Sequence, residues 1–373
     1  MHDLPERAEL VRLHAVAQGL GADRADEVLA GIESLDDGPT GWSTVWLAAG
    51  RRHYERGCPG EAVPYLNLAR FPYVSTIDGA AAHALCVEAF GDWSARRGVR
   101  RVLLPVAGRE VPVWVAERGS ALFGRSGDVL LVCGGIVSIK EQWGRFVELG
   151  RRLGVTVVLT ELPGVGENPL PYRPTSGRDL SALLDALSER TPVRRVFAAA
   201  MSFGGAVALR AAGSDRRIER VFSVGPPLRY LFTDQRWWQR IPETTKDALE
   251  RTTGVSVAEL PGVLGEFAVT RRELSESTAR VTVIASRRDE IVPPADVTVV
   301  AREVRGATVL AFDDVHGSPN HMLDTALTLT GELADFVGVP FGLRHIPFLL
   351  RGVRGRATEV TARTRLAEVR SER

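Results

Sequence analysis

The sequence is poor in cysteine and in long hydrophobic runs, and each shortage excludes a class of protein. Only Cys58, Cys86 and Cys133 occur, an odd number without C-x-x-C spacing, so neither a disulfide framework nor a thiolate metal site is indicated. No stretch reaches the about eighteen uninterrupted apolar residues of a membrane span. The N-terminus lacks the basic start and apolar run of a secretory signal peptide. We therefore expect a cytoplasmic protein with no metal, no cofactor and no membrane partner.

Excess charge of either sign is also missing. The 47 Lys and Arg residues nearly balance the 46 Asp and Glu residues, and the net charge of +1 gives no reason to expect a nucleic-acid partner. Almost all positive charge is arginine, because Lys140 and Lys246 are the only lysines. A chain of 373 residues suffices for one large α/β domain and a smaller unit. The expected partner is a small-molecule substrate.

The order of apolar residues divides the chain into three regions. Residues 1–98 place apolar residues at three-to-four spacing between Gly- and Pro-rich breaks, which predicts a helical N-terminal domain or cap. Over residues 99–338, two short valine-rich segments precede a regular alternation of strand and helix. This alternation predicts a mostly parallel, doubly wound sheet, with a helical cap insertion at 228–278. Residues 339–373 are arginine-rich without a core face, and are either a docking tail or partly disordered.

The stretch "AMSFGG" predicts a nucleophile on a tight turn between a strand and a helix. Ser202 directly follows an apolar strand, and Gly204 and Gly205 allow the next helix to start close against that strand. Ala200 stands where the usual G-x-S-x-G motif has its first glycine, but it is small enough to keep this approach open. By itself the match also fits a glycine-softened turn with a solvent-exposed serine.

An acid and a base follow Ser202 in the order typical of α/β-hydrolases. Asp289 comes after a predicted strand in "RRDEIVPP", and the neighbouring Glu290 is the alternative acid. The base is either His316, in the loop after the last predicted strand, or His321, at the start of the final helix. The loop position favours His316. Three groups at three strand ends, in this order, together predict a Ser-Asp-His triad.

The sequence also predicts the backbone donors of the oxyanion hole and the roles of Cys133 and the other histidines. Gly134 and Gly135 let the backbone turn inward after a buried strand, so the N–H groups of Ile136 and Phe203 are the expected oxyanion hole. Cys133 beside this turn is expected to be a buried strand-end residue. The other histidines considered are expected to be surface or core residues, since no metal-binding spacing exists; they are His14, His53, His83 and His345.

With these motifs in place, the chain resembles an α/β-hydrolase of the FrsA-like group, which includes 2,6-dihydroxypseudooxynicotine hydrolase. Ayg1-type polyketide-shortening hydrolases resemble the same group. The stretches "CGGIVSIKEQW", "TELPGVGENP", "AMSFGG", "RRDEIVPP" and "DDVHGSPNH" carry the match, and "YLNLARFPY" fits more loosely. Val137 stands where the group usually has an acidic residue, which bears on substrate contacts. Lys140 falls in a matched loop, where a structural role beside Glu141 is expected.

The resemblance implies hydrolysis of either a carbon–carbon bond next to a ketone, as in a β-diketone or polyketide, or an ester-like bond. Two alternatives stay open: the same triad could transfer the acyl group to another acceptor or cyclise the substrate, and a hydrolase scaffold could serve as a binding protein. The resemblance also implies a homodimer. The site is expected between the N-terminal helices and the core, under the 228–278 insertion. There the expected substrate contacts, besides Gly134 and Gly135, are Tyr230, Asp234, Trp237 and Trp238. The alternative, equally weighted, is that the aromatic residues only pack the insertion onto the core.

Overall fold

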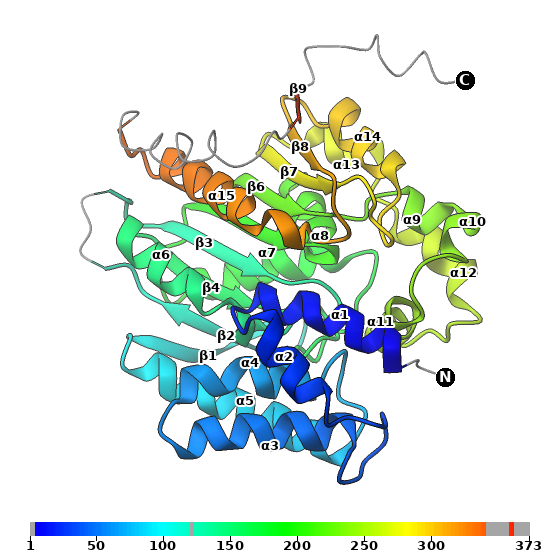
Figure 1. The fold of residues 1–373 in the computed structure, drawn as a ribbon. Coiled ribbons are helices and arrows are strands. Elements are labelled where there is room, and N and C mark those ends of the chain that lie inside the picture. The colour runs from blue at the N-terminus through cyan, green and yellow to red at the C-terminus, as the bar shows by residue number, and fades with distance from the viewer. Residues whose placement is uncertain (1–3, 120–122, 341–357, 362–373) are drawn as a thin grey trace.

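A computed structural model describes residues 4–119, 123–340 and 358–361, and its centre is one sheet of nine strands. The strand order is β1-β2-β4-β3-β5-β6-β7-β8-β9 (Figure 1). The strands are β1 (Val99–Val106), β2 (Arg109–Ala116), β3 (Asp128–Cys133), β4 (Thr156–Thr160), β5 (Arg195–Met201), β6 (Ile218–Val224), β7 (Arg280–Ser286), β8 (Thr308–Phe312) and β9 (Thr358–Thr361). From β4 to β8 all neighbours are parallel, while β1, β2 and β9 are antiparallel to theirs. The predicted mostly parallel, doubly wound sheet is confirmed.

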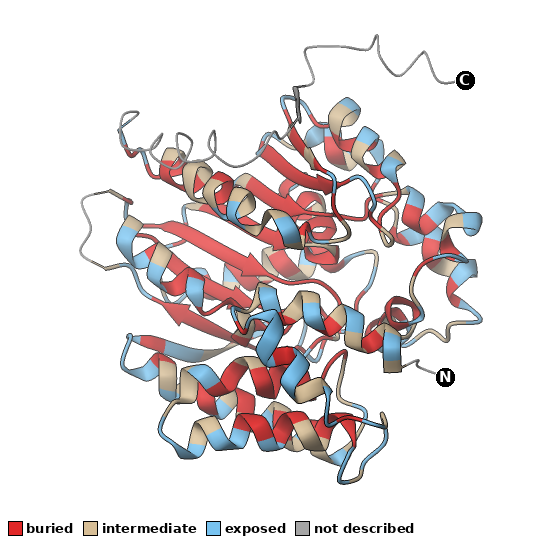
Figure 2. Ribbon diagram, viewed as in Figure 1, coloured by how far each residue is buried: buried red, intermediate tan, exposed pale blue. Residues whose placement is uncertain are grey.

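The central strands are continuous apolar runs because helices cover both faces of the sheet. Every residue of β3 and of β4 is buried, and Figure 2 shows the strands as the buried interior between helices with exposed outer faces. The helices connecting these strands are η1 (Lys140–Trp143), α6 (Arg145–Leu153), α7 (Ser176–Ser188), α8 (Phe203–Ala212), α14 (Pro294–Glu303), η3 (Pro319–His321) and α15 (Met322–Phe336). With parallel strands in the centre, the carboxyl ends of β3, β5, β6, β7 and β8 meet at one edge, where ligands bind in such sheets.

Five helices precede the sheet, where helical periodicity predicts them. They are α1 (Leu4–Ala17), α2 (Ala22–Leu29), α3 (Trp42–Glu55), α4 (Pro59–Ala69) and α5 (Ile77–Ala95). The rings of Phe90 on α5 and Trp114 on β2 lie 5.0 Å apart, which fixes this group against the sheet. Helix α1 contacts α2 and α4 and extends toward α11 (Figure 1).

A predominantly helical insertion separates β6 from β7, as predicted. It contains α9 (Tyr230–Thr233), α10 (Gln235–Trp238), α11 (Glu243–Thr253), α12 (Leu260–Val263), η2 (Leu264–Phe267) and α13 (Arg271–Glu276). Helices α1 and α11 are joined directly, because a Glu6 carboxylate oxygen accepts hydrogen bonds from Thr244 N at 3.0 Å and Thr244 Oγ1 at 2.6 Å. Within the ranges that the structure describes, every helix is too short or too polar to cross a lipid bilayer.

The arginine-rich end of the chain contributes one element that the sequence analysis did not predict. Strand β9 pairs antiparallel with β8 and forms an edge of the sheet. Of the predicted tail 339–373, the structure describes β9 and residues 339–340, and the rest lies outside the described residues.

Candidate active site

Ser202 lies on a sharp turn between β5 and α8, and its backbone has φ 52° and ψ −125°. A non-glycine residue in this region is strained, and such strain is typical of a serine presented at the top of an α/β sheet. The Ser202 N–H donates to the Val224 carbonyl at 2.8 Å, which ties the turn to the neighbouring strand. The side chain is thereby directed out of the sheet edge and into a cavity.

The glycines around this turn are required by close backbone approach. A Cβ atom at position 204 would lie 2.4 Å from the Gly134 carbonyl oxygen, and one at position 205 would lie 2.0 Å from Ser223 Oγ. A Cβ at position 135 would lie 2.9 Å from the Ser202 Cβ. Ala200 is buried inside β5 and causes no obstruction there. The helix therefore starts against the strand as the sequence predicts, with alanine tolerated at 200.

His316 and Asp289 complete a continuous chain of hydrogen bonds with Ser202. His316 Nε2 lies 3.0 Å from Ser202 Oγ, and His316 Nδ1 lies 2.9 Å from Asp289 Oδ2. Burial favours the neutral imidazole, but the Asp289 carboxylate outweighs it, so the pKa of His316 is raised above 6.5. Asp289 is itself held, because its Oδ1 accepts from the N–H groups of Ile291 and Val292. The structure thus brings together the three residues predicted as a triad.

The two alternative residues have other contacts. His321 Nδ1 lies 2.9 Å from Asp314 Oδ2, and the His321 ring stacks on Phe312. His321 is therefore paired with Asp314 and not with Asp289. Glu290 contacts the backbone and not the ring of the base, since its Oε2 accepts from the His316 N–H at 3.0 Å. The geometry therefore favours His316 over His321 and Asp289 over Glu290.

Two residues that sequence reasoning missed hold the base in place. Asp314 is fully buried and accepts hydrogen bonds from the Val315 N–H and from both the backbone and side chain of Asn320. Gly225, with φ 57°, lies so close that a Cβ there would be 2.9 Å from His316 Cε1. The sequence does carry a signal for Asp314, because an aspartate directly before a Gly-, Ser-, Pro- and Asn-rich turn often accepts hydrogen bonds from that turn. Nothing in the sequence marks Gly225.

The predicted oxyanion donors lie at the edge of the same cavity. Ile136 and Phe203 both line it, and among the described residues neither N–H has a hydrogen-bond acceptor. Phe203 is the first residue of α8, where backbone N–H groups are unpaired and the helix dipole favours negative charge. Gly135 lines the cavity, whereas Gly134 packs behind it against Gly204. Both N–H groups are available to a developing oxyanion.

Arg70 and Lys140 fix the loop that carries Ile136. The buried Arg70 guanidinium donates to the Val137 carbonyl, to the Pro72 carbonyl at 2.9 Å and twice to the Asn67 side chain, at 2.8 and 2.7 Å. This joins the end of α4 to the loop after β3. Burial lowers the pKa of Arg70 to about 10, which still leaves it charged at neutral pH.

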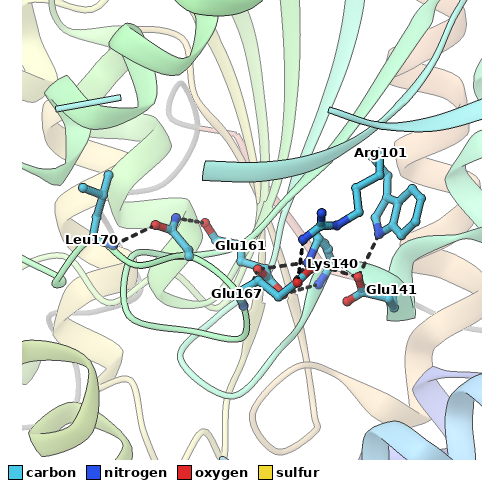
Figure 3. A network of polar contacts seen from close by, with 8 residues as sticks. Arg101, Lys140, Glu141, Glu161, Glu167 and Leu170 are labelled. Carbon is cyan, nitrogen blue, oxygen red and sulfur yellow. Dashed lines mark hydrogen bonds and ion pairs between the residues drawn. The ribbon is translucent and has the colours of Figure 1, made fainter. Parts of the chain in front are cut away.

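Lys140 is fully buried among three carboxylates, as Figure 3 shows. Its Nζ lies 3.0 Å from Glu141, 3.3 Å from Glu161 and 2.7 Å from Glu167. Burial alone would lower the pKa of Lys140, but the carboxylates raise it, so the lysine stays charged. Burial raises the pKa of Glu161 to about 7. The structural role predicted for Lys140, beside Glu141, is therefore confirmed.

A cavity of about 420 Å³ opens over Ser202 and His316. Its walls come from the N-terminal helices, the loop after β3, α11 and the segment from His316 to α15. Most of its lining is apolar; these residues include Leu10, Leu13, Ala17, Phe71, Ile136, Val137, Trp143, Phe146, Leu149, Met322, Ala326 and Leu329. As expected, the cavity lies between the N-terminal helices and the sheet, with the insertion contributing Thr244 and Thr245.

Besides Gly134, four more of the predicted substrate contacts are not brought to this cavity. Tyr230, Asp234, Trp237 and Trp238 do not line it. Asp234 caps α10 by accepting from the Arg236 and Trp237 N–H groups. Trp237 Nε1 donates to the Ile291 carbonyl at 2.8 Å, Trp238 is buried, and Tyr230 is exposed. Trp237 and Trp238 pack the insertion onto the core, so the prediction is corrected: α11, and not α9 or α10, faces the cavity.

Cys133 and His14 are the remaining sequence candidates beside the site. Burial raises the pKa of the Cys133 thiol to about 12, and all three cysteines are free, so it is the buried strand-end residue expected. His14 is neither a surface nor a core residue, because it lines the cavity with Leu10, Leu13 and Ala17. The helical periodicity of α1 was the available signal, but periodicity does not distinguish a core face from a cavity wall.

Comparisons with known proteins agree with this architecture. Residues 129–354 match the model of the alpha/beta hydrolase family. A solved structure of wild-type AbyA5 is 37% identical, with a TM-score of 0.88, and the match covers 95% of this chain and 100% of that one. A second AbyA5 structure is 36% identical, with a TM-score of 0.80, covering 87% and 96%.

The 2,6-dihydroxy-pseudo-oxynicotine hydrolase structure is 20% identical, with a TM-score of 0.69, and the match covers 87% of this chain and 95% of that one. At this identity it shows a shared fold. No curated protein matches the chain significantly.

Proposed function

The chain belongs to the alpha/beta hydrolase family, and from this premise we propose that it is a serine hydrolase acting through Ser202, His316 and Asp289. The observation that carries the proposal is the unbroken relay from Ser202 Oγ to His316 Nε2 at 3.0 Å and from His316 Nδ1 to Asp289 at 2.9 Å. A serine needs an adjacent base to become a nucleophile, and the base needs a carboxylate to hold its tautomer.

In the proposed reaction, Ser202 Oγ attacks a substrate carbonyl while His316 Nε2 takes its proton. The oxygen of that carbonyl becomes negative beside the N–H groups of Ile136 and Phe203. His316 then returns the proton to the leaving group, and the substrate's acyl half stays on Ser202. Water, deprotonated by the same His316, hydrolyses this ester and frees the serine.

The proposed substrate is a largely apolar ketone or ester with room for an aromatic or polyketide-like arm. The supporting observation is the cavity itself, whose volume of about 420 Å³ and apolar walls suit such an arm and offer few polar contacts. We favour cleavage of a carbon–carbon bond in a β-diketone, with an ester as the second candidate bond. The helices at 1–98 and the 228–278 insertion would act together as the cap.

Acyl transfer or cyclisation by the same residues is the second candidate function. It is favoured by the cover that α1 and α11 make over Ser202, because excluding water gives another acceptor the advantage. Turnover in H₂¹⁸O separates the two: hydrolysis places one ¹⁸O atom in the acid product, and transfer or cyclisation places none.

Labelling with a fluorophosphonate tests the nucleophile. We expect one adduct, on the peptide that contains Ser202, and no adduct on the folded Ser202→Ala variant. Ser138, the other serine next to the oxyanion loop, supplies the matched control, and Ser138→Ala should still be labelled. A folded protein that stays unlabelled, or that is labelled on another residue, would contradict the serine mechanism and favour a binding protein on a hydrolase scaffold.

Two further expectations from the sequence stay as proposals, namely a homodimer and a cytoplasmic location. Sedimentation velocity over a range of concentrations tests the first, since a stable dimer sediments as twice the 40.5 kDa chain.

A further inference from the structure

We propose that His14 is a substrate-binding residue that donates a hydrogen bond to the second carbonyl oxygen of an uncharged β-dicarbonyl substrate. It would hold the half of the substrate that leaves, while Ile136 and Phe203 hold the half that is attacked. This inference rests on the proposed function and deepens it, because it names the chemistry that the cavity selects.

The position of His14 is fixed by its surroundings on α1 and α4. Its ring lies 4.8 Å from the ring of Phe71, which also lines the cavity. Its backbone carbonyl accepts from Gln18 Nε2 at 3.2 Å, and Asn67 Nδ2 in turn donates to Gln18 Oε1 at 2.7 Å. The contact with Phe71 thus holds the imidazole at the wall of the cavity that contains Ser202 and His316, and the bonds through Gln18 tie the backbone of α1 to α4.

The His14 ring nitrogens are available to a ligand. Among the described residues, none forms a hydrogen bond or an ion pair with either nitrogen, whereas Nδ1 of His316 and Nδ1 of His321 each contact a carboxylate. A polar group left without a partner against apolar walls costs free energy, which a ligand oxygen of the right geometry recovers. The buried His83 also has an Nε2 without a partner among the described residues, but it does not line this cavity, so His14 differs from it by facing the space beside Ser202.

The charges around His14 determine which oxygen it can bind. Burial, then the positive charges of Arg70 and His316, lower the pKa of His14 to about 4, so the ring is neutral at pH 7, with one donor and one acceptor. The Arg70 guanidinium is already engaged by protein oxygens. The Glu290 side chain also lines the cavity and, when ionised, adds negative charge. A ketone or enol oxygen suits this environment, and a carboxylate does not.

The bonding changes show what such a donor would contribute. Attack forms the bond between Ser202 Oγ and the first carbonyl carbon, and the proton moves to His316. The bond from that carbon to the central carbon then breaks, and its electron pair moves onto the second carbonyl as an enolate. Negative charge develops on the oxygen that His14 contacts, where a neutral imidazole can stabilise it. The His316 proton goes to the central carbon, giving a ketone, and water releases the acid from Ser202.

Binding to an inactive protein tests this role without any turnover. The probe is 1-phenyl-1,3-butanedione, an uncharged β-diketone with an aromatic arm, titrated by calorimetry into Ser202→Ala and into Ser202→Ala/His14→Phe. Phenylalanine keeps the ring volume and the contact with Phe71 but has no donor. We expect the second protein to bind about tenfold more weakly, the effect of one lost hydrogen bond. Equal affinity, or binding to neither protein, would overturn the role of His14.

Turnover supplies the second, independent measurement. In proteins that keep Ser202, His14→Phe should lower kcat/KM for 1-phenyl-1,3-butanedione by tenfold or more. The value for p-nitrophenyl butanoate should change less than about twofold, because that ester has no second carbonyl. His53→Phe, a change on α3 outside the cavity where the ring stacks on Tyr65, is the matched control and should alter neither.

The two proposals fail in different ways. A wild-type protein that cleaves neither compound contradicts the serine hydrolase, while the calorimetry still decides whether His14 binds a β-diketone. A wild-type protein that cleaves the diketone as fast as His14→Phe does leaves the hydrolase intact and removes His14 from the site.

Discussion

At the scale of single residues, the proton affinity of His316 is set by two opposing effects. Burial disfavours the imidazolium, and the adjacent Asp289 carboxylate more than compensates, so the pKa lies above 6.5. A base must be neutral to accept the Ser202 proton. We therefore expect kcat/KM to fall as the pH drops through a value above 6.5. Asp289→Asn should move this limb to lower pH and reduce the plateau by roughly 10⁴-fold, as judged from triads of known mechanism.

The neighbouring Asp313 provides the control for this pH profile. It lies in the same loop region, is exposed, and forms a surface pair with Arg288. Asp313→Asn should leave both the limb and the plateau unchanged. An Asp289→Asn profile that still declines at the wild-type pH would mean that His316 is not the titrating group.

The two histidines of the "DDVHGSPNH" loop allow a second test at this scale. His316→Ala should lower kcat for an ester by at least about 10³-fold, because it removes the ring nitrogen that lies 3.0 Å from Ser202 Oγ and takes its proton. His321→Ala removes a ring that pairs with Asp314 and stacks on Phe312. It should cost about 1–2 kcal/mol of stability with a much smaller effect on kcat. The reverse order of activities would assign the base to His321.

At the scale of elements, the loop after β3 depends on a buried cation. Lys140→Met keeps the aliphatic stem but leaves three carboxylates around an apolar group, and breaking such a buried cluster costs about 3–5 kcal/mol. Urea unfolding at pH 7.5 measures this loss. Lys246→Met is the matched control, since the partner Glu243 is largely exposed, and it should cost less than about 1 kcal/mol. Equal losses would mean that the cluster contributes no more than the half-exposed pair of Lys246 and Glu243.

The same cluster has a defined dependence on pH. The pKa of Glu161 is raised to about 7 in the folded protein, above the ordinary value of 4.5, so the native state binds more protons between these values. Stability from this group therefore increases as the pH falls through that window. In Lys140→Met the Glu161 carboxyl loses the nearby cation, so its pKa should rise further. The difference in unfolding free energy between variant and wild type should shrink as the pH is lowered from 7.5 to 5.

The sequence predicted the features that depend on a few neighbouring residues and missed those that depend on contacts between distant segments. The turn at Ser202 and the glycines beside it are fixed by backbone geometry within a few residues, and strand–helix alternation gave the sheet. The aromatic residues at 230–238 were assigned to the substrate because composition does not say which face of a short helix packs on the core. Strand β9 carries no strong apolar pattern, and its pairing with β8 depends on a contact between distant segments.

At the scale of the whole molecule, the cavity is closed by elements from opposite ends of the fold. Helix α1 spans from the loop that contains η3, after β8, to α11 in the insertion, and the contact of Glu6 with Thr244 is its tie to α11. No sequence signal within α1 predicts that it covers the cavity, because η3 and α11 are more than two hundred residues away along the chain. The function of α1 is thus a property of the assembled fold, and it can be tested at Glu6.

Glu6→Ala removes both hydrogen bonds to Thr244 and should loosen α1 over the cavity. An arm that fills the cavity relies on Leu10 and Leu13, whereas a small acyl group held at Ser202 does not. We expect KM for p-nitrophenyl decanoate to rise about five- to tenfold, the effect of roughly 1 kcal/mol, with p-nitrophenyl acetate changed less than twofold. Glu9→Ala, an exposed change on the same helix, should alter neither. If both esters lose activity equally in Glu6→Ala, α1 supports the triad itself and does not act as the wall that selects the arm.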